Sequence, residues 1–272
     1  MFSGMSFIKV GIVGCGCIGS QLCRAIASGK VRAEVAALND IDREHAERIK
    51  EELSLRAPIV PFEELVDMSD VIAECAAAEC APKVAEAAMS AGKAALIMSV
   101  GGLLQREDLF DRVREHGARI IIPSGALAGV DAIEAAAVAG IDEVTLTTTK
   151  PPAGLRGAPY IAEKGLDLGS IARRTVIFEG TALEAVSAFP QNVNVAATLS
   201  LAGVGPHRTK VKVVADPSAS ANSHEVRAVG AFGTLTTKTE NVPSEDNPKT
   251  SHLAALSAIA ALKKAVSVAQ SG

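Results

Sequence analysis

The chain has 272 residues, of which 48% are hydrophobic and 21% charged, a composition typical of a globular protein and not of a disordered or fibrous one. Its formal net charge is −4 and no cluster of Lys and Arg is present, so we expect a small-molecule partner and no nucleic acid. The longest uncharged apolar stretch, residues 94–104, is about half of the ~20 residues that a membrane span requires, so we expect no membrane association.

The cysteines all lie in the first third of the chain and include no C-x-x-C pair. They are Cys15, Cys17, Cys23, Cys75 and Cys80. We therefore expect neither a disulfide framework nor a metal site, and we interpret them as small packing residues. The first ten residues lack the positive segment and the long apolar segment of a secretion signal, which predicts a cytoplasmic protein.

Apolar runs and helical patterns alternate along residues 1–125, the first predicted domain. Residues 7–13, FIKVGIV, are short enough for a strand buried on both faces, and residues 20–28 have the spacing of an amphipathic helix. Further strands are expected at 33–40, 57–60, 71–76, 94–100 and 118–125, and further helices at 42–53, 81–92 and 106–117. This alternation predicts an α/β fold with helices on both faces of a doubly wound parallel sheet.

Residues 126–245 have a different pattern and predict a second, α+β domain with a mixed sheet. Segments rich in Val and Thr alternate with period two, as the strands of antiparallel or mixed sheets do. Strands are expected at 143–150, 174–180, 209–217, 224–233 and 234–242, and helices at 128–140 and 181–189. The second of these helices is expected to begin with a capping box formed by Thr181 and Glu184.

Residues 246–272 are the third predicted segment. Their apolar spacing is strongly periodic, which predicts a helix that begins at Thr250 or Ser251. We expect this C-terminal helix to pack back on the first domain.

Three glycines, Gly14, Gly16 and Gly19, follow the first predicted strand with the spacing G-x-G-x-x-G. In this context Gly14 allows a tight turn, Gly16 lets the backbone approach a pyrophosphate, and Gly19 lets the next helix lie close to the strand. The N–H groups at the start of that helix, where Cys17 and Ile18 stand, attract phosphates. The segment therefore predicts a dinucleotide-binding domain of the Rossmann type.

Asp40 ends the second predicted strand, about 20 residues after the glycines. An acid at this place accepts a hydrogen bond from the adenosine ribose 2′-hydroxyl, which favours NAD. Arg32 and Arg43 are near in sequence and either could bind a 2′-phosphate, so NADP remains an alternative.

Three further loops are expected to line the cofactor crevice, because each follows a later strand of the sheet. They are residues 74–79, 98–102 and 123–129.

Histidines are the side chains best able to exchange a proton near neutral pH. His224, at the start of a predicted strand, is the preferred candidate for a catalytic residue. His45 and His116 lie on polar helices and are expected at the surface. His207, in a turn, and His252, near a helix start, remain as alternatives.

Eight segments in order resemble the L-aspartate dehydrogenase family: KVGIVGCGCIGSQL, MSVGGL, PSGALAGVDAI, TTTKPP, FPQNVNVAATLSLAG, ADPSASANSHEV, GAFG and NPKTSHLAALSAIAALK. The resemblance covers nearly the whole chain, and the asparagine-rich and N-x-H segments are its most particular parts. It implies a Rossmann domain and an α+β domain that also forms the subunit contact of a homodimer. It also implies that NAD or NADP is used to oxidise L-aspartate to iminoaspartate, which hydrolyses to oxaloacetate and ammonia and also feeds NAD biosynthesis.

The resemblance also implies roles for single residues. The catalytic histidine of the family corresponds to His224, which we expect to act as the general base. The cofactor contacts of the family correspond to Ala126 or Ala128 and to Asn192 or Asn194, and the resemblance does not decide within either pair.

Two positions depart from the family pattern. The family more often has an aliphatic residue where Ser223 stands, and it frequently has an Arg-Lys pair where Thr149 and Lys150 stand. The second departure leaves one fewer cation for the substrate.

The two carboxylates of the implied substrate require cations or N–H donors. Lys150 and Lys249 are expected to provide positive charge, with Arg156 and Arg173 as alternatives. Thr250, at a helix start, is expected either to bind an anion or to cap the helix.

Two kinds of alternative function remain open. The two-domain layout also hosts homoserine-dehydrogenase-like and dihydrodipicolinate-reductase-like oxidoreductases. A protein that senses NAD without catalysis is a third reading, although it gives no reason for a histidine that faces the nicotinamide.

Overall fold

The computed structural model describes residues 7–116, 118–190, 194–244 and 250–271. The chain divides into two compact units: unit 1 comprises Met1–Pro123 and Ala255–Gly272, and unit 2 comprises Ser124–Ala254. Within the described residues, no helix combines the length and the apolar character needed to cross a membrane.

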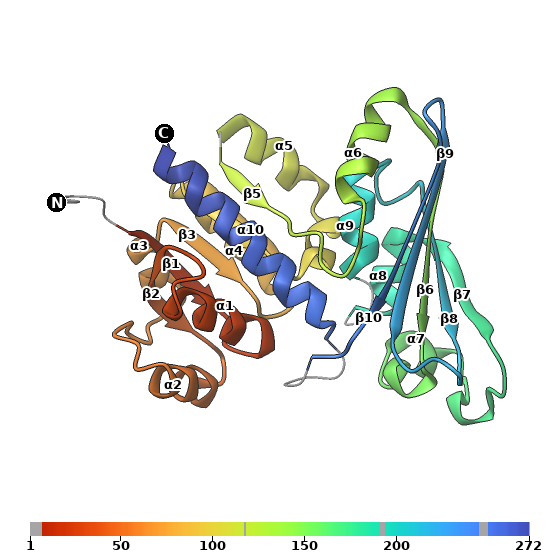
Figure 1. Cartoon of the computed structure of the whole chain (residues 1–272), viewed down its shortest axis with the longest axis horizontal. Coiled ribbons are helices and arrows are strands. Elements are labelled where there is room, and N and C mark those ends of the chain that lie inside the picture. Colours follow the sequence, from red (N-terminus) through yellow and green to blue (C-terminus); the bar gives the residue numbers. More distant parts are fainter. Residues whose placement is uncertain (1–6, 117, 191–193, 245–249, 272) are drawn as a thin grey trace. The chain divides into compact units, whose positions relative to one another are not determined.

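Unit 1 is built on a five-stranded sheet in which all neighbouring strands are parallel (Figure 1). The strands are β1 (Ile8–Val13), β2 (Ala33–Asn39), β3 (Val71–Glu74), β4 (Ala94–Ile97) and β5 (Arg119–Ile121). Their order is β2-β1-β3-β4-β5, so the chain reverses direction across the sheet after β2. The predicted doubly wound parallel sheet is confirmed, and its switch point lies between the carboxyl ends of β1 and β3.

Hydrophobic clusters on the two faces of this sheet hold its helices. Alternating residues of β1 separate the clusters, since Val10 and Ile12 belong to one and Val13 to the other. The first cluster includes α1 (Cys17–Ala27), α2 (Arg43–Glu52) and the C-terminal α10 (His252–Ser271). The second includes α3 (Phe62–Met68), α4 (Cys80–Ser90), the 3-10 helix η1 (Val100–Gln105) and α5 (Glu107–His116).

Unit 1 differs from expectation at two neighbouring segments. Residues 57–60 form no strand, and a single bridge joins Ile59 to Leu38. Pro58 and Pro61 flank this bridge and have no N–H group for a longer ladder. The helix α3 that follows was not predicted, because seven residues are too few to show a helical period.

Unit 2 is built on a five-stranded mixed sheet, as the sequence predicts. Its strands are β6 (Ile141–Lys150), β7 (Thr175–Thr181), β8 (Thr209–Ala215), β9 (Asn222–Gly230) and β10 (Gly233–Asn241). They are ordered β10-β9-β6-β8-β7, and only β6 and β8 run parallel among these neighbours. Along β9, His224 and Val226 are buried whereas Glu225 and Arg227 are exposed, so the sheet has an inner face and an outer face.

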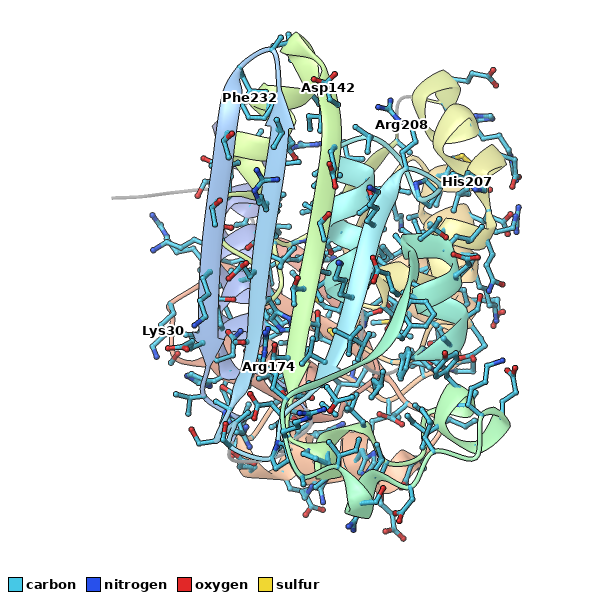
Figure 2. All side chains as sticks on the ribbon, turned by 90° about the vertical axis from the view of Figure 1, so that its right-hand side faces the viewer. Lys30, Asp142, Arg174, His207, Arg208 and Phe232 are labelled. Carbon is cyan, nitrogen blue, oxygen red and sulfur yellow. The ribbon has the colours of Figure 1, made fainter. Side chains whose placement is uncertain are left out.

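The helices of unit 2 are α6 (Val130–Ala139), α7 (Pro159–Glu163), α8 (Ala182–Ala188) and α9 (Asn194–Ala202). The structure confirms the capping box of α8, in which Thr181 and Glu184 satisfy each other's backbone N–H groups. Helix α9 was not predicted, because six of its nine residues are buried and an apolar helix lacks the amphipathic period. Figure 2 looks onto the outer face, over which no helix of the described part of unit 2 lies.

Candidate functional site

The glycine loop of unit 1 is shaped by contacts that only glycine permits. Gly14 has φ +90°, and a Cβ there would lie 2.7 Å from backbone atoms of Cys75 and Ala76. A Cβ on Gly19 would overlap the carbonyl oxygen of Gly14. Around Gly16, in contrast, no atom lies within 4 Å of the place of a Cβ. Gly14 and Gly19 therefore close the turn, whereas Gly16 leaves open space beside it.

Helix α1 begins directly at this open space. Gly16 is its N-cap residue and has no side chain to satisfy the amides of the first turn, which starts with Cys17 and Ile18. These two residues are half-buried. The first-turn amides of a helix and the positive end of its dipole attract a phosphate group. Loop and helix start together form a cradle that fits a dinucleotide.

Asp40 connects the end of β2 to the glycine loop. Its Oδ2 accepts a hydrogen bond of 2.6 Å from the Cys15 amide, and its Oδ1 accepts one of 2.9 Å from the Asp42 amide. The Asp40 side chain is only 8% exposed. The sequence placed Asp40 at this strand end but did not predict its bond to the loop, since the two partners are 25 residues apart.

A buried carboxylate joins two further loops at the carboxyl edge of the same sheet. Glu74, which is fully buried, accepts hydrogen bonds from Ala76 N at 2.8 Å and from Ser99 N and Oγ, both at 2.9 Å. Burial raises the pKa of Glu74, while these donors oppose the change. A Cβ on Gly102 would overlap the Ala78 carbonyl oxygen, so the two loops also pack closely. Glu74 thus fixes loops 74–79 and 98–102 to each other.

The loop 123–129 is held on β10 within unit 2. The carbonyl oxygen of Ala126 accepts a hydrogen bond of 2.8 Å from Thr239 Oγ1, and that of Ala128 accepts one of 3.0 Å from Thr237 Oγ1. Ala126 is buried whereas Ala128 is exposed. Their role as cofactor contacts stays a prediction.

His224 lies near the start of β9, between β6 and β10, and its residue is 5% exposed. Its Nδ1 is 3.2 Å from Thr148 Oγ1 on the neighbouring strand β6. Burial and, to a lesser extent, the charge of Lys150 lower the pKa of His224 to about 3. The imidazole is therefore neutral at neutral pH, and one of its two ring nitrogens carries a lone pair.

Lys150 ends β6 two residues after Thr148, so the two side chains point to the same face of the sheet. Lys150 is 4% exposed, and burial lowers its pKa to about 8. It lines a pocket of about 260 Å³ together with Asn222, which precedes His224 by two residues on the same face. This part of unit 2 thus brings a buried cation, an amide and an imidazole to one end of the sheet.

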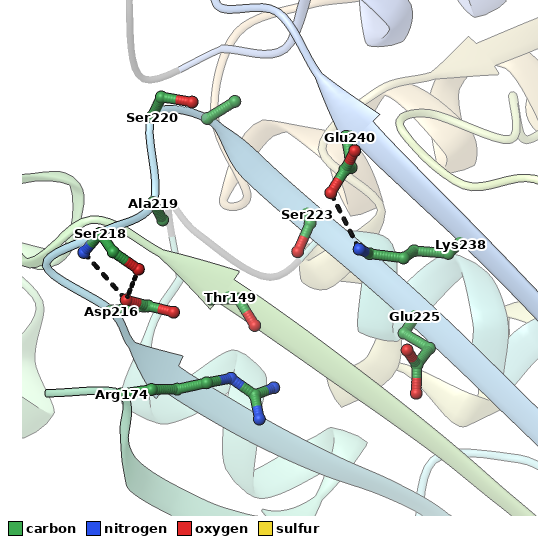
Figure 3. Close-up of a pocket in the computed structure, with 11 residues that line it drawn as sticks. Thr149, Arg174, Asp216, Ser218, Ala219, Ser220, Ser223, Glu225, Lys238 and Glu240 are labelled. Carbon is green, nitrogen blue, oxygen red and sulfur yellow. Dashed lines mark hydrogen bonds and ion pairs between the residues drawn. The ribbon is translucent and has the colours of Figure 1, made fainter.

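The outer face carries a second pocket of about 410 Å³ at the same end of the sheet (Figure 3). Thr149 and Ser223, the two positions that depart from the family pattern, both line it. Thr149 therefore faces away from the pocket that Lys150 lines. Because successive residues of a strand alternate between faces, a cation at position 149 would face the outer pocket, and the expected loss of a substrate cation stays a prediction.

Of the other predicted site residues, the structure describes some and leaves two outside its described ranges. Asn192 and Lys249 lie outside the described residues. Asn194 is the first residue of α9 and is half-buried. Thr250 is half-buried, and its carbonyl oxygen accepts a hydrogen bond of 2.7 Å from the Ser244 amide. The remaining candidate cations and histidines are exposed or half-buried: Arg156, Arg173, His45, His116, His207 and His252.

Two family models match the chain, one in each half. The model described as "Homoserine dehydrogenase, NAD binding domain" matches residues 14–123, and the model described as "Aspartate dehydrogenase, C-terminal" matches residues 131–265. An L-aspartate dehydrogenase of Methanosarcina mazei is 49% identical and covers 97% of this chain and 99% of its own. The chain belongs to the L-aspartate dehydrogenase family.

More distant members of the family agree. The L-aspartate dehydrogenase of Bradyrhizobium diazoefficiens is 41% identical over 95% of this chain and 92% of its own. The crystal structure of aspartate dehydrogenase from Thermotoga maritima aligns with a TM-score of 0.71 at 26% identity, over 97% of both chains. For this member of the L-aspartate dehydrogenase family, the glycine cradle is thus part of an NAD-binding domain.

Proposed function

We propose that this protein catalyses the NAD(P)-dependent oxidative deamination of L-aspartate to iminoaspartate, which hydrolyses to oxaloacetate and ammonia and also feeds NAD biosynthesis. The observation that carries the proposal is a buried Lys150 that lines the 260 Å³ pocket and whose charge acts on the buried His224, both in the half of the chain that matches the aspartate dehydrogenase model. A dicarboxylic amino acid needs a cation for a carboxylate and a base for its amine. Lys150 lines this pocket, and His224 follows its lining residue Asn222 by two residues on the same face of β9.

The test is formation of NADH or NADPH by the purified protein, followed by absorbance, with L-aspartate and with homoserine. We expect turnover with aspartate and none above background with homoserine. Turnover with homoserine alone would favour the homoserine-dehydrogenase-like alternative. Binding of NAD without turnover of any amino acid would favour the sensor.

The reaction needs a base because hydride leaves the substrate Cα only when the amine is neutral. Burial and the charge of Lys150 keep His224 neutral, so one ring nitrogen has a lone pair for a proton of the substrate ammonium, and the pKa of His224 has to rise on substrate binding for the transfer to occur. After His224 has released this proton to solvent, the same base can activate the water that hydrolyses the imine. When bound, the nicotinamide supplies the hydride acceptor, and the residues of this chain orient the substrate and move its protons.

Lys150 links substrate binding to the basicity of His224. Its positive charge contributes to the low pKa of His224. A substrate carboxylate beside Lys150 offsets that charge, so the pKa of His224 rises when the substrate binds. The imidazole therefore becomes a stronger base in the presence of aspartate than in the empty pocket.

Replacing Lys150 with methionine is expected to weaken aspartate binding and to stabilise the fold. The apparent KM for aspartate should rise about tenfold or more, since a hydrogen-bonded charge partner is lost. The pKa of Lys150 is about 8 in the folded state and 10.5 in the unfolded state. Below pH 8 this difference lowers the free energy of unfolding by on the order of 3 kcal/mol. Wild-type stability should therefore rise with pH from about 8 to about 10.5.

The measurement is urea unfolding of both proteins at pH 7 and pH 10. The advantage of Lys150→Met should be large at pH 7 and should shrink as the unfolded lysine also loses its proton. An equal stability difference at both pH values would contradict the depressed pKa of Lys150.

Replacing Asp40 with asparagine is expected to shift cofactor preference toward NADP. Asparagine keeps one oxygen that can accept from the Cys15 amide, loses the hydrogen bond from the Asp42 amide, and removes the charge that repels a 2′-phosphate. The ratio of kcat/KM for NADP to that for NAD should rise about tenfold, the scale of one charge interaction near a surface. Asp42→Asn, at an exposed neighbour, is the control and should change the ratio less. An unaltered ratio in Asp40→Asn would remove Asp40 from cofactor selection.

We also propose that the protein is a cytoplasmic homodimer that associates through the outer face of the unit 2 sheet. Support comes from the open outer face in Figure 2 and from Val176 on β7, which is 52% exposed there. The five cysteines are free, as is usual in a reducing compartment. Light scattering that gives the mass of a single chain would contradict the dimer.

A further inference from the structure

Thr148 lies directly opposite His224 in the sheet of unit 2. The register of β6 and β9 pairs the two residues, and their Oγ1 and Nδ1 atoms are 3.2 Å apart. Thr148 is fully buried and His224 nearly so. Because both residues are shielded from bulk water, the Thr148 hydroxyl and not a solvent molecule is the hydrogen-bond partner of Nδ1.

The other strand beside His224 does not offer an equivalent partner. Thr239 of β10 is paired with His224 in the register, but its hydroxyl donates to the Ala126 carbonyl oxygen at 2.8 Å. The two threonines therefore differ. In the described part of the chain, the Thr148 hydroxyl is hydrogen-bonded to the imidazole of His224, whereas the Thr239 hydroxyl is hydrogen-bonded to a backbone carbonyl oxygen.

Few charges face the ring from the elements around it. Lys150 of β6 lies on the same face and has donors only. On β9 and β10, Glu225 and Glu240 line the outer pocket, on the other side of the sheet. On α6, which packs against β9, Asp131 and Glu134 are exposed. Among the described residues, therefore, the side-chain group within hydrogen-bond distance of His224 Nδ1 is a hydroxyl and not a carboxylate.

We propose that Thr148 is a positioning residue for the base, accepting a hydrogen bond from Nδ1–H of His224 and thereby keeping the lone pair on Nε2. A neutral imidazole has one protonated nitrogen and one accepting nitrogen, so holding the proton at Nδ1 decides which atom is basic. The inference rests on the proposed function of His224. In the proton transfer an N–H bond of the substrate ammonium breaks, its electron pair stays on the amine, and a new N–H bond forms at Nε2.

A hydroxyl suits this task for an electrostatic reason. A carboxylate behind a histidine fixes the tautomer but also stabilises the imidazolium by a full charge. When the neutral Thr148 hydroxyl accepts the hydrogen bond from Nδ1–H, it holds this tautomer with little stabilisation of the charged ring. His224 can therefore release its proton after each transfer, and its pKa remains free to respond to the substrate charge beside Lys150.

The direct test is nitrogen-15 NMR of the wild-type protein with labelled histidine, in which the His224→Asn variant identifies the resonances. At pH 7 we expect a neutral ring that is protonated at Nδ1 and unprotonated at Nε2. A proton on Nε2 would overturn the inference. This readout needs no substrate, so it separates a failure of the inference from a failure of the proposed function, which would appear as no turnover of aspartate.

A kinetic comparison tests the consequence. Thr148→Val keeps the shape but loses the acceptor, and kcat should fall about tenfold, the upper range for one neutral hydrogen bond. The affinity for NADH should not change, and Thr148→Ser should restore kcat to within about twofold. Thr147→Val is the matched control, because Thr147 points to the outer face of the same strand.

Wild-type kcat and an unchanged pH profile in Thr148→Val would overturn the positioning role. If the valine variant does not fold, Thr148→Ser and Thr148→Ala give the same comparison with and without the hydroxyl. A similar loss of kcat in both of these would assign Thr148 to packing alone and would equally overturn the proposal.

Discussion

Replacing His224 with alanine is expected to lower kcat for aspartate oxidation by about 10²-fold or more, the usual contribution of a general base. The imidazole is buried, neutral and within hydrogen-bond distance of Thr148, so the variant loses the proposed proton acceptor on the sheet face that Lys150 shares. The affinity for NADH, measured by fluorescence titration, should remain within about twofold, because unit 1 carries the NAD-binding domain.

Two further variants separate chemistry from packing. His224→Asn retains a polar side chain and should lose as much turnover as the alanine variant, since neither residue is basic. His207→Ala removes an exposed histidine of the same unit and should behave as the wild type. Wild-type turnover in both His224 variants would remove this residue from the mechanism.

Replacing Gly16 with alanine is expected to abolish most of the affinity for NADH without unfolding the protein. The φ of Gly16 is −69°, which alanine adopts readily, and no atom lies within 4 Å of the new Cβ. The free energy of unfolding should therefore change by less than about 1 kcal/mol. The added methyl group occupies the space through which the backbone approaches the pyrophosphate, so the Kd for NADH should rise about 100-fold.

Gly19→Ala is the contrasting variant in the same motif. Its Cβ would overlap the Gly14 carbonyl oxygen, and the clash involves backbone that cannot move aside cheaply. We expect a loss of about 1–3 kcal/mol of stability, the range of overpacked cores. Calorimetric titration and urea unfolding of both variants measure the difference. Equal NADH affinity in Gly16→Ala and wild type would show that the cradle does not hold the pyrophosphate.

The order of the helices and strands can be predicted from local sequence patterns. The strand–glycine–helix segment at residues 8–27, the alternation through β5 and the capping box of α8 all depend on residues close in sequence. Helix α9 could not be predicted in this way. Most of its residues are buried, so its sequence lacks the polar face by which an amphipathic helix is recognised.

The hydrogen bonds that build the site depend on partners far apart in the chain. Asp40 reaches the Cys15 amide across 25 residues, and Thr148 reaches His224 across 76. The sequence suggested Asp40 and His224 as candidates but not their partners, because strand register is fixed only when the sheet assembles. Thr148 stands in a run of three threonines, and only the pleat distinguishes it from its neighbours.

The central claim is that His224 takes the proton from the amine of aspartate in the pocket lined by Lys150. A crystal structure of the protein with NADH and L-aspartate tests it directly, because the reduced cofactor cannot oxidise the bound substrate. The account predicts His224 Nε2 within about 3.2 Å of the aspartate nitrogen, with a carboxylate at Lys150. Aspartate bound elsewhere, or an imidazole out of reach of its amine, would contradict it.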